Sequence, residues 1–191
     1  MSMSKADYSD DLNEARRRAQ ELVASLTPEQ LLRRPDPGKW SIAECIVHLN
    51  ITAATVQKLM ASAIEQGRNQ QVFSKGPFSI GPKGRLLVWI AEPPPKFRIR
   101  APKDVRPPAT IDDPLQVLPA FMKAQDEWEQ LMREQQGLDL ERVKVGQGVF
   151  RMRLAAALPW MMAHQRRHLL QAENVKRQIF SAAPIAATST I

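Results

Sequence analysis

The sequence predicts an all-α protein folded as a four-helix bundle. Four stretches of about 20 residues carry apolar side chains at helical spacing, and no stretch alternates convincingly as a strand. A chain of 191 residues suits one domain with a full-sized core. Amphipathic helices without strands bury their apolar stripes by packing against one another in a bundle. The first link is short, whereas the second is long enough to cross the bundle.

The first two long helices are expected over residues 7–26 and 41–67. A short helical turn between them begins at Thr27 in "TPEQ". The second helix begins in "GKWSIAECIVHLN", residues 38–50, where Ser41 and Glu44 form a capping box. Trp40 is expected to pack on Cys45 as a hydrophobic staple, and Gly67 is the expected stop.

Residues 67–113 form a proline-rich, basic insertion between the second and third long helices. Up to residue 110 this segment holds nine Lys or Arg, two acids and eight of the fifteen prolines, and it carries the whole net charge of +7. An unstructured loop of this length is unusual in a compact domain, so we expect an ordered excursion with a short helix over residues 85–91. Four aromatic side chains are expected to dock it on the bundle: Phe73, Phe78, Trp89 and Phe97. Its charge is compatible with a solvated surface, an anionic ligand or a partner surface.

The third and fourth long helices follow this insertion. Asp113 is the expected cap of the third, with Pro114 in its first position and Gly137 at its end. Pro119 should bend this helix or delay its start. The fourth runs over residues 154–180, with Pro159 in a similar early position. Residues 1–180 thus form a single domain, and residues 181–191 form a tail without periodicity.

Three histidines are the candidate site residues. His164 and His168 are four residues apart on the fourth helix, roughly 80° and 40° from the centre of its apolar stripe, so they share one face. This is the H-x₃-H spacing by which two imidazoles of one helix bind one metal ion. His48 lies at the boundary of the second helix's stripe, where it can face the groove between two helices. Buried histidines that only form hydrogen bonds are the alternative.

Two motifs connect these histidines to a known family. "WSIAECIVHL" resembles the second-helix motif of the DinB/YfiT-like superfamily, and "HQRRHLLQ" resembles its fourth-helix motif. "PPPKFRIRAPKDVRPP" is similar to an insertion in one branch of these proteins. The resemblance covers most of residues 7–180. It implies a four-helix bundle in an up-down-down-up arrangement, a divalent metal ion held by His48, His164 and His168, and a homodimer.

Three histidine ligands would leave positions open for water or substrate, as in catalytic metal sites. Zinc or nickel suits three nitrogen ligands. The resemblance implies thiol-dependent S-transferase or hydrolase chemistry on a small molecule, including low-molecular-weight thiols. Gln165, Gln171 or Glu44 could orient the imidazoles, although Glu44 suits the helix cap better. Arg98, Arg100 or Lys103 could pair with substrate carboxylates.

Other functions stay open. Cys45 is expected to be a packed core residue rather than a nucleophile. A non-catalytic metal-binding or dimeric interaction protein is one alternative, with Phe97 and the neighbouring prolines supporting dimerisation. Nucleic-acid binding through residues 67–110 is another, although no recognised motif accompanies it. One cysteine, no secretory signal and no apolar run of about 20 residues predict a cytoplasmic protein without membrane contact.

Overall fold

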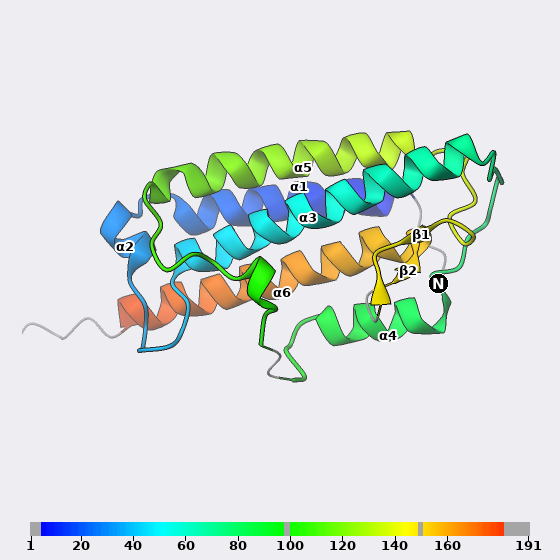
Figure 1. Ribbon diagram of the computed structural model, residues 1–191. Helices are drawn as coiled ribbons and strands as arrows, with labels where there is room; N and C mark the ends of the chain where they lie inside the picture. Colours follow the sequence, from blue (N-terminus) through cyan, green and yellow to red (C-terminus); the bar gives the residue numbers. More distant parts are fainter. Residues whose placement is uncertain (1–4, 98–99, 149–150, 182–191) are drawn as a thin grey trace, which may run out of the picture.

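The computed structural model describes residues 5–97, 100–148 and 151–181 and is mostly helical (Figure 1). Four long helices lie side by side: α1 (Lys5–Val23), α3 (Ile42–Asn69), α5 (Val117–Glu134) and α6 (Leu154–Ser181). Shorter elements connect them: α2 (Pro28–Leu32), α4 (Gly81–Ala91), the 3₁₀ turns η1 (Lys103–Val105) and η2 (Pro114–Gln116), and the strands β1 (Lys144–Val145) and β2 (Met152–Arg153). The expected helical bundle is confirmed. The expected tail beyond residue 181 lies outside the described residues.

The four long helices surround one interior. α3 contacts α5 and α6, and α1 contacts the same two helices from the other side. In Figure 1, α3 and α5 run from left to right, whereas α1 and α6 run from right to left. The interior is filled at one end around Phe121, Ile42 and Leu169, and at the other around Trp128, Met60 and Met161, all of which are fully buried. Among the described residues, no helix is long and apolar enough to cross a membrane.

Side-chain caps start α2 and α3 where the sequence predicts. The Ser41 hydroxyl accepts a hydrogen bond from the Glu44 backbone N–H at 3.2 Å, and the Glu44 carboxylate accepts one from the Ser41 N–H at 2.8 Å. Thr27 forms the same box at the start of α2. Both boxes satisfy backbone donors that a helix start otherwise leaves unpaired. Helix α3, which carries His48, therefore has a defined first turn.

Helix α5 starts later than its cap. The Asp113 carboxylate accepts a hydrogen bond from the Leu115 N–H at 3.0 Å, but it caps the 3₁₀ turn η2, and α5 begins at Val117. Pro119 then falls in the first α-helical turn, where a missing N–H costs nothing. The delayed start is thus the one that Pro119 predicts.

Two features of the chain differ from expectation. Gly67 does not end α3 but lies buried inside it, and a Cβ there would stand 2.8 Å from Cγ2 of Val143. The glycine is explained by this close packing rather than by a helix stop. The antiparallel pair β1–β2, with Val145 opposite Met152, was not expected, because two-residue strands are too short to show a periodicity.

The expected docking of the connection by aromatic side chains is wrong for three of the four. Phe73, Trp89 and Phe97 are 54%, 50% and 53% exposed, and only Phe78 is partly buried. Helix α4 packs against the bundle core through Leu87 instead, with Gly84 facing α6. A Cβ on Gly84 would lie 2.7 Å from the Cβ of Ala156, so the backbones approach closely there. The aromatic side chains therefore point away from the bundle.

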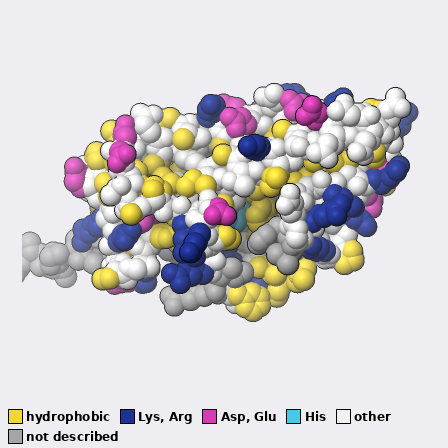
Figure 2. Space-filling view, in the orientation of Figure 1, with side chains coloured by type: hydrophobic (Ala, Val, Ile, Leu, Met, Phe, Trp, Pro, Cys, Tyr) yellow, Lys and Arg dark blue, Asp and Glu magenta, His cyan; other side chains and the backbone are white. Residues whose placement is uncertain are grey.

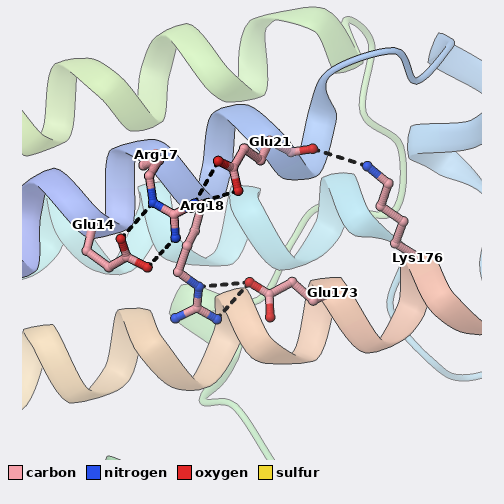
Figure 3. A network of polar contacts seen from close by, with 6 residues as sticks. All are labelled: Glu14, Arg17, Arg18, Glu21, Glu173 and Lys176. Atoms are coloured by element: carbon pink, nitrogen blue, oxygen red, sulfur yellow. Dashed lines mark hydrogen bonds and ion pairs between the residues drawn. The ribbon is translucent and has the colours of Figure 1, made fainter.

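Polar contacts join α1 to α6 on the bundle surface (Figure 3). Arg18 forms a 2.8 Å ion pair with Glu173. The Lys176 ammonium donates to the carbonyls of Glu21 and Leu22 at 3.2 and 2.8 Å, near the end of α1. These bonds satisfy carbonyls that the end of a helix leaves unpaired. They fix α6, the helix of His164 and His168, along the length of α1.

Candidate metal centre

The three histidines lie together where α3 packs against α6. His48 comes from α3, and His164 and His168 come from successive turns of α6. Their ring centroids are 4.5–5.1 Å apart, and one ligand nitrogen from each lies within 4.8 Å of the other two. The helical spacing of the sequence therefore leads to one cluster in space.

Hydrogen bonds at Nδ1 set the tautomers of two of these imidazoles. The carbonyl of Val105 in η1 accepts from Nδ1–H of His48 at 2.6 Å, and Oε1 of Gln171 accepts from Nδ1–H of His168 at 2.9 Å. A neutral imidazole with its proton on Nδ1 has a lone pair on Nε2. Both Nε2 atoms are thus free to act as ligands, with an outer partner on the opposite nitrogen as in most protein metal sites.

The spacing of the nitrogens suits a divalent transition-metal ion. Nε2 of His48 lies 3.3 Å from Nε2 of His164. Two nitrogens bound tetrahedrally at about 2.0–2.1 Å would be roughly 3.3–3.4 Å apart. The donor set consists only of imidazoles, which zinc, nickel and related ions accept. The residues present therefore fit such an ion.

Burial keeps all three imidazoles neutral, as metal ligation requires. It lowers the pKa of His48, against the opposing effect of the Val105 hydrogen bond. Burial and the nearby His48 lower the pKa of His168 to about 3. Burial, with His168 and His48 close by, holds the pKa of His164 well below its usual range. The cluster therefore presents unprotonated nitrogens at neutral pH.

Two tryptophans flank the cluster. The Trp40 ring lies 5.0 Å from His48 and 6.1 Å from His168, and the Trp160 ring lies 5.4 Å from His164. Trp40 packs against the core group that includes Cys45, but it also covers the histidines, a role that the staple motif does not predict. His48 is only 2% exposed, although its helical position predicts a boundary residue, because Trp40 and η1 cover it. His164 and His168 keep partial exposure, and a small patch of histidine surface is visible in Figure 2.

The expected outer partners are only partly found. Gln171 accepts a hydrogen bond from His168. In contrast, Oε1 of Gln165 and Nδ1 of His164 are buried with no partner among the described residues. The Glu44 carboxylate is taken by its cap and by Arg34. The partner that sequence reasoning missed is the carbonyl of Val105. Every residue carries a backbone carbonyl, so the sequence holds no signal for it.

Arginines beside the histidines hold the end of α4 and the residues that follow it. Arg167 donates to the carbonyls of Ile90 and Phe97 at 3.0 and 2.7 Å. Arg166 binds the Glu92 carboxylate at 2.8 and 2.7 Å and also reaches Asp11 of α1. The helical wheel places both arginines away from the core, and the structure shows that α4 and its following segment cover them.

The other candidate residues are either buried in the core or exposed to solvent. Cys45 is fully buried, and burial raises the pKa of its thiol, so it is a core residue as expected rather than a nucleophile. Arg100 and Lys103 are exposed, and Arg98 lies outside the described residues. The part of the connection that contacts the cluster is therefore the backbone of η1.

The fold of this chain is similar to that of known proteins. The family model of the DinB superfamily matches residues 11–172. Among solved structures, YfiT from Bacillus subtilis is similar, with 16% identity, a TM-score of 0.62, and coverage of 94% of this chain and 91% of YfiT. It is described as a probable metal-dependent hydrolase with an unusual four-helix bundle topology, and at this identity the likeness shows the fold. No curated protein matches the chain.

Proposed function

Because the chain belongs to the DinB superfamily, we propose that it is a divalent-metal-dependent enzyme whose ion is held by His48, His164 and His168. The ligand atoms are the Nε2 nitrogens, two of which already have their lone pairs set by hydrogen bonds at Nδ1. Zinc or nickel is the proposed ion.

The observation that carries this proposal is the size of the donor set. Among the described residues, no fourth histidine, cysteine or carboxylate joins the three histidines. Structural zinc sites are closed by four protein ligands, whereas catalytic sites keep a position for water or substrate. Three ligands, two of them partly exposed, therefore support a catalytic site better than a structural one.

The chemistry proposed is activation of a nucleophile. A divalent ion whose charge is not neutralised by its ligands lowers the pKa of water and thiols and polarises carbonyls. The residues of the chain would keep the imidazoles neutral, orient them through Val105 and Gln171, and shield them with Trp40 and Trp160. Hydrolysis is the first candidate reaction, because YfiT is described as a probable metal-dependent hydrolase.

Thiol transfer is the second candidate, and one observation favours it. No carboxylate of the described residues joins the histidine cluster, so the site has no evident general base. An attacking water usually needs a group to take its second proton, whereas a thiolate attacks without further proton transfer. A low-molecular-weight thiol is therefore proposed as co-substrate.

Metal content tests the proposed ligands. Protein purified without an affinity tag should carry close to one equivalent of zinc or nickel by elemental analysis. Single changes of His48, His164 and His168 to Ala should each remove the metal while circular dichroism shows a folded bundle. Cys45→Ser is the control, since a fully buried core thiol should not affect metal content. A wild-type protein that stays metal-free after reloading would refute the proposal.

Activity then separates the two reactions. The metal-loaded protein is incubated with activated esters alone, and separately with an electrophile and a simple thiol. Hydrolysis of the ester without thiol supports the hydrolase, whereas metal-dependent loss of thiol supports the transferase. Turnover by the wild type that persists in His48→Ala would contradict both.

A further inference from the structure

A group of large apolar side chains is exposed on and beside α4. Leu86 and Trp89 are 55% and 50% exposed and lie three residues apart, on one face of α4. Phe97, 53% exposed, meets Trp89 with its ring centroid 6.1 Å away. We call these three residues the α4 tip. In Figure 2, hydrophobic side chains gather along the lower edge of the molecule, below the position of α4 and the segment that follows it.

The cost of exposing these side chains is not explained by the fold. Leu87 packs α4 against the bundle core, and Gly84 faces Ala156 of α6, so residues other than the α4 tip hold α4 in place. Large apolar side chains that cluster on a surface usually mark an interaction site.

The charge around the α4 tip is cationic. Lys96 places its ammonium 5.3 Å from the Trp89 ring centroid, and Arg85 lies four residues before Trp89 on α4. Between residues 67 and 103 the sequence has one acid, Glu92, and Arg166 binds both of its carboxylate oxygens. The α4 tip thus combines apolar side chains with cations and has no free carboxylate from its own segment.

We propose that the α4 tip binds the surface of an anionic lipid membrane. Trp and Phe favour the boundary between headgroups and acyl chains, and nearby Lys and Arg are attracted to anionic lipids. Two weak signals of this kind together give reversible attachment to a surface without any span. The sequence predicts no membrane contact because it lacks a spanning segment, and surface binding does not need one.

Other occupants fit the charge and geometry less well. A second copy of the chain would bring the same cations face to face, without carboxylates to pair them. Single-stranded nucleic acid would need aromatic faces open for stacking, but Lys96 covers one face of Trp89 and Phe97 meets it edge-on at 68°. An anionic bilayer requires neither a free ring face nor complementary acids.

Vesicle flotation of the full-length protein tests the proposal. The vesicles are phosphatidylcholine alone, or phosphatidylcholine with about 30% phosphatidylglycerol, at low salt and at about 0.5 M salt. The test variant changes Leu86, Trp89 and Phe97 together to Ser. The matched control is Leu115→Ser, which replaces a side chain that is 56% exposed at η2. All four side chains replaced are exposed, so both variants should fold.

The wild type and the Leu115→Ser control should float with anionic vesicles only, and less at high salt. The triple variant should partition at least about tenfold more weakly. Equal binding by the wild type and the triple variant would overturn the proposal, as would no binding by the wild type. Light scattering after size exclusion is run in parallel: a wild-type dimer that the triple variant converts to monomer, without vesicle binding, would assign the tip to a second copy. If RNA oligonucleotides abolish the flotation of the wild type with vesicles, the membrane proposal is overturned in favour of nucleic-acid binding.

Discussion

Acid should destabilise the metal-free protein through its histidine cluster, and His168 allows the effect to be calculated. Burial and the neighbouring His48 lower the pKa of His168 from 6.5 to about 3. In the unfolded chain the imidazole takes up a proton near pH 6.5, whereas in the folded chain it stays neutral down to about pH 3. The unfolded state therefore binds more protons in this window, and stability falls as the pH falls.

The magnitude follows from the two pKa values. Between pH 7 and pH 5, the unfolded state gains about 0.7 of a proton at His168 and the folded state gains almost none. Integration over this interval gives a loss of about 2 kcal/mol in the free energy of unfolding. His48 and His164, whose pKa values are also lowered, change stability in the same direction.

Urea unfolding of wild type and His168→Gln, both stripped of metal, measures this contribution at pH 7, 6 and 5. Carboxylates titrate in both proteins and largely cancel in the difference between the two curves, which reports the His168 imidazole together with its effect on the neighbouring His164. The free energy of unfolding of the wild type should fall by about 2 kcal/mol more than that of the variant between pH 7 and pH 5. Parallel curves would refute a lowered pKa for the partly buried His168. The absolute stability of the variant does not enter, because only the dependence on pH is compared.

Three further results are expected. Zinc at about 100 times its dissociation constant should stabilise the wild type by about 2.7 kcal/mol and thus raise its melting temperature by about 5–10 °C. It should not stabilise His48→Ala. An unchanged melting temperature of the wild type would argue against the metal site. Gly84→Ala should lower the free energy of unfolding in urea by about 1–2 kcal/mol, since its Cβ would lie 2.7 Å from that of Ala156. Adding Ala156→Gly should recover part of this loss. If the losses of the two single variants simply add in the double variant, this contact is excluded. The Gln125 Oε1 is buried without a partner among the described residues, whereas its Nε2 donates to the Phe121 carbonyl at 3.2 Å. Gln125→Met removes the unpaired oxygen together with this one bond, so the free energy of unfolding in urea should change by no more than about 1 kcal/mol. A loss of about 3 kcal/mol or more would contradict this reasoning.

Local chemistry made much of the fold predictable. The capping box of Ser41 and Glu44 depends on residues three apart, so the sequence contains all that it needs. Pro119 predicts the late start of α5 by the same local logic. The spacing of His164 and His168 predicts a shared helix face, and His48 could be added because the two motifs resemble one family. Each of these features depends on residues within one or two turns of a helix, which is why the sequence predicts it.

Contacts between distant segments were not predictable in this way. Gly67 looks like a helix stop, and only the approach of Val143 shows that its missing side chain makes room for a neighbour. The exposure of Trp89 and Phe97 depends on how this connection lies on the bundle, where Leu87 and Gly84 make the contacts. Arg166 and Arg167 face outward on their own helix and become partly buried only because another segment crosses them. These outcomes depend on tertiary packing, which a pattern along one helix does not contain.

The bond between His48 and the carbonyl of Val105 has a consequence for how this protein can vary. Substitution at position 105 changes the side chain but leaves the hydrogen-bond acceptor in place, so the partner of His48 tolerates replacement by any residue that keeps the same backbone path. A one-residue insertion or deletion in residues 101–106 has the opposite effect, since it moves the carbonyl without removing any chemical group. Which ring nitrogen of His48 carries the proton thus depends on the length of this loop rather than on the identity of residue 105.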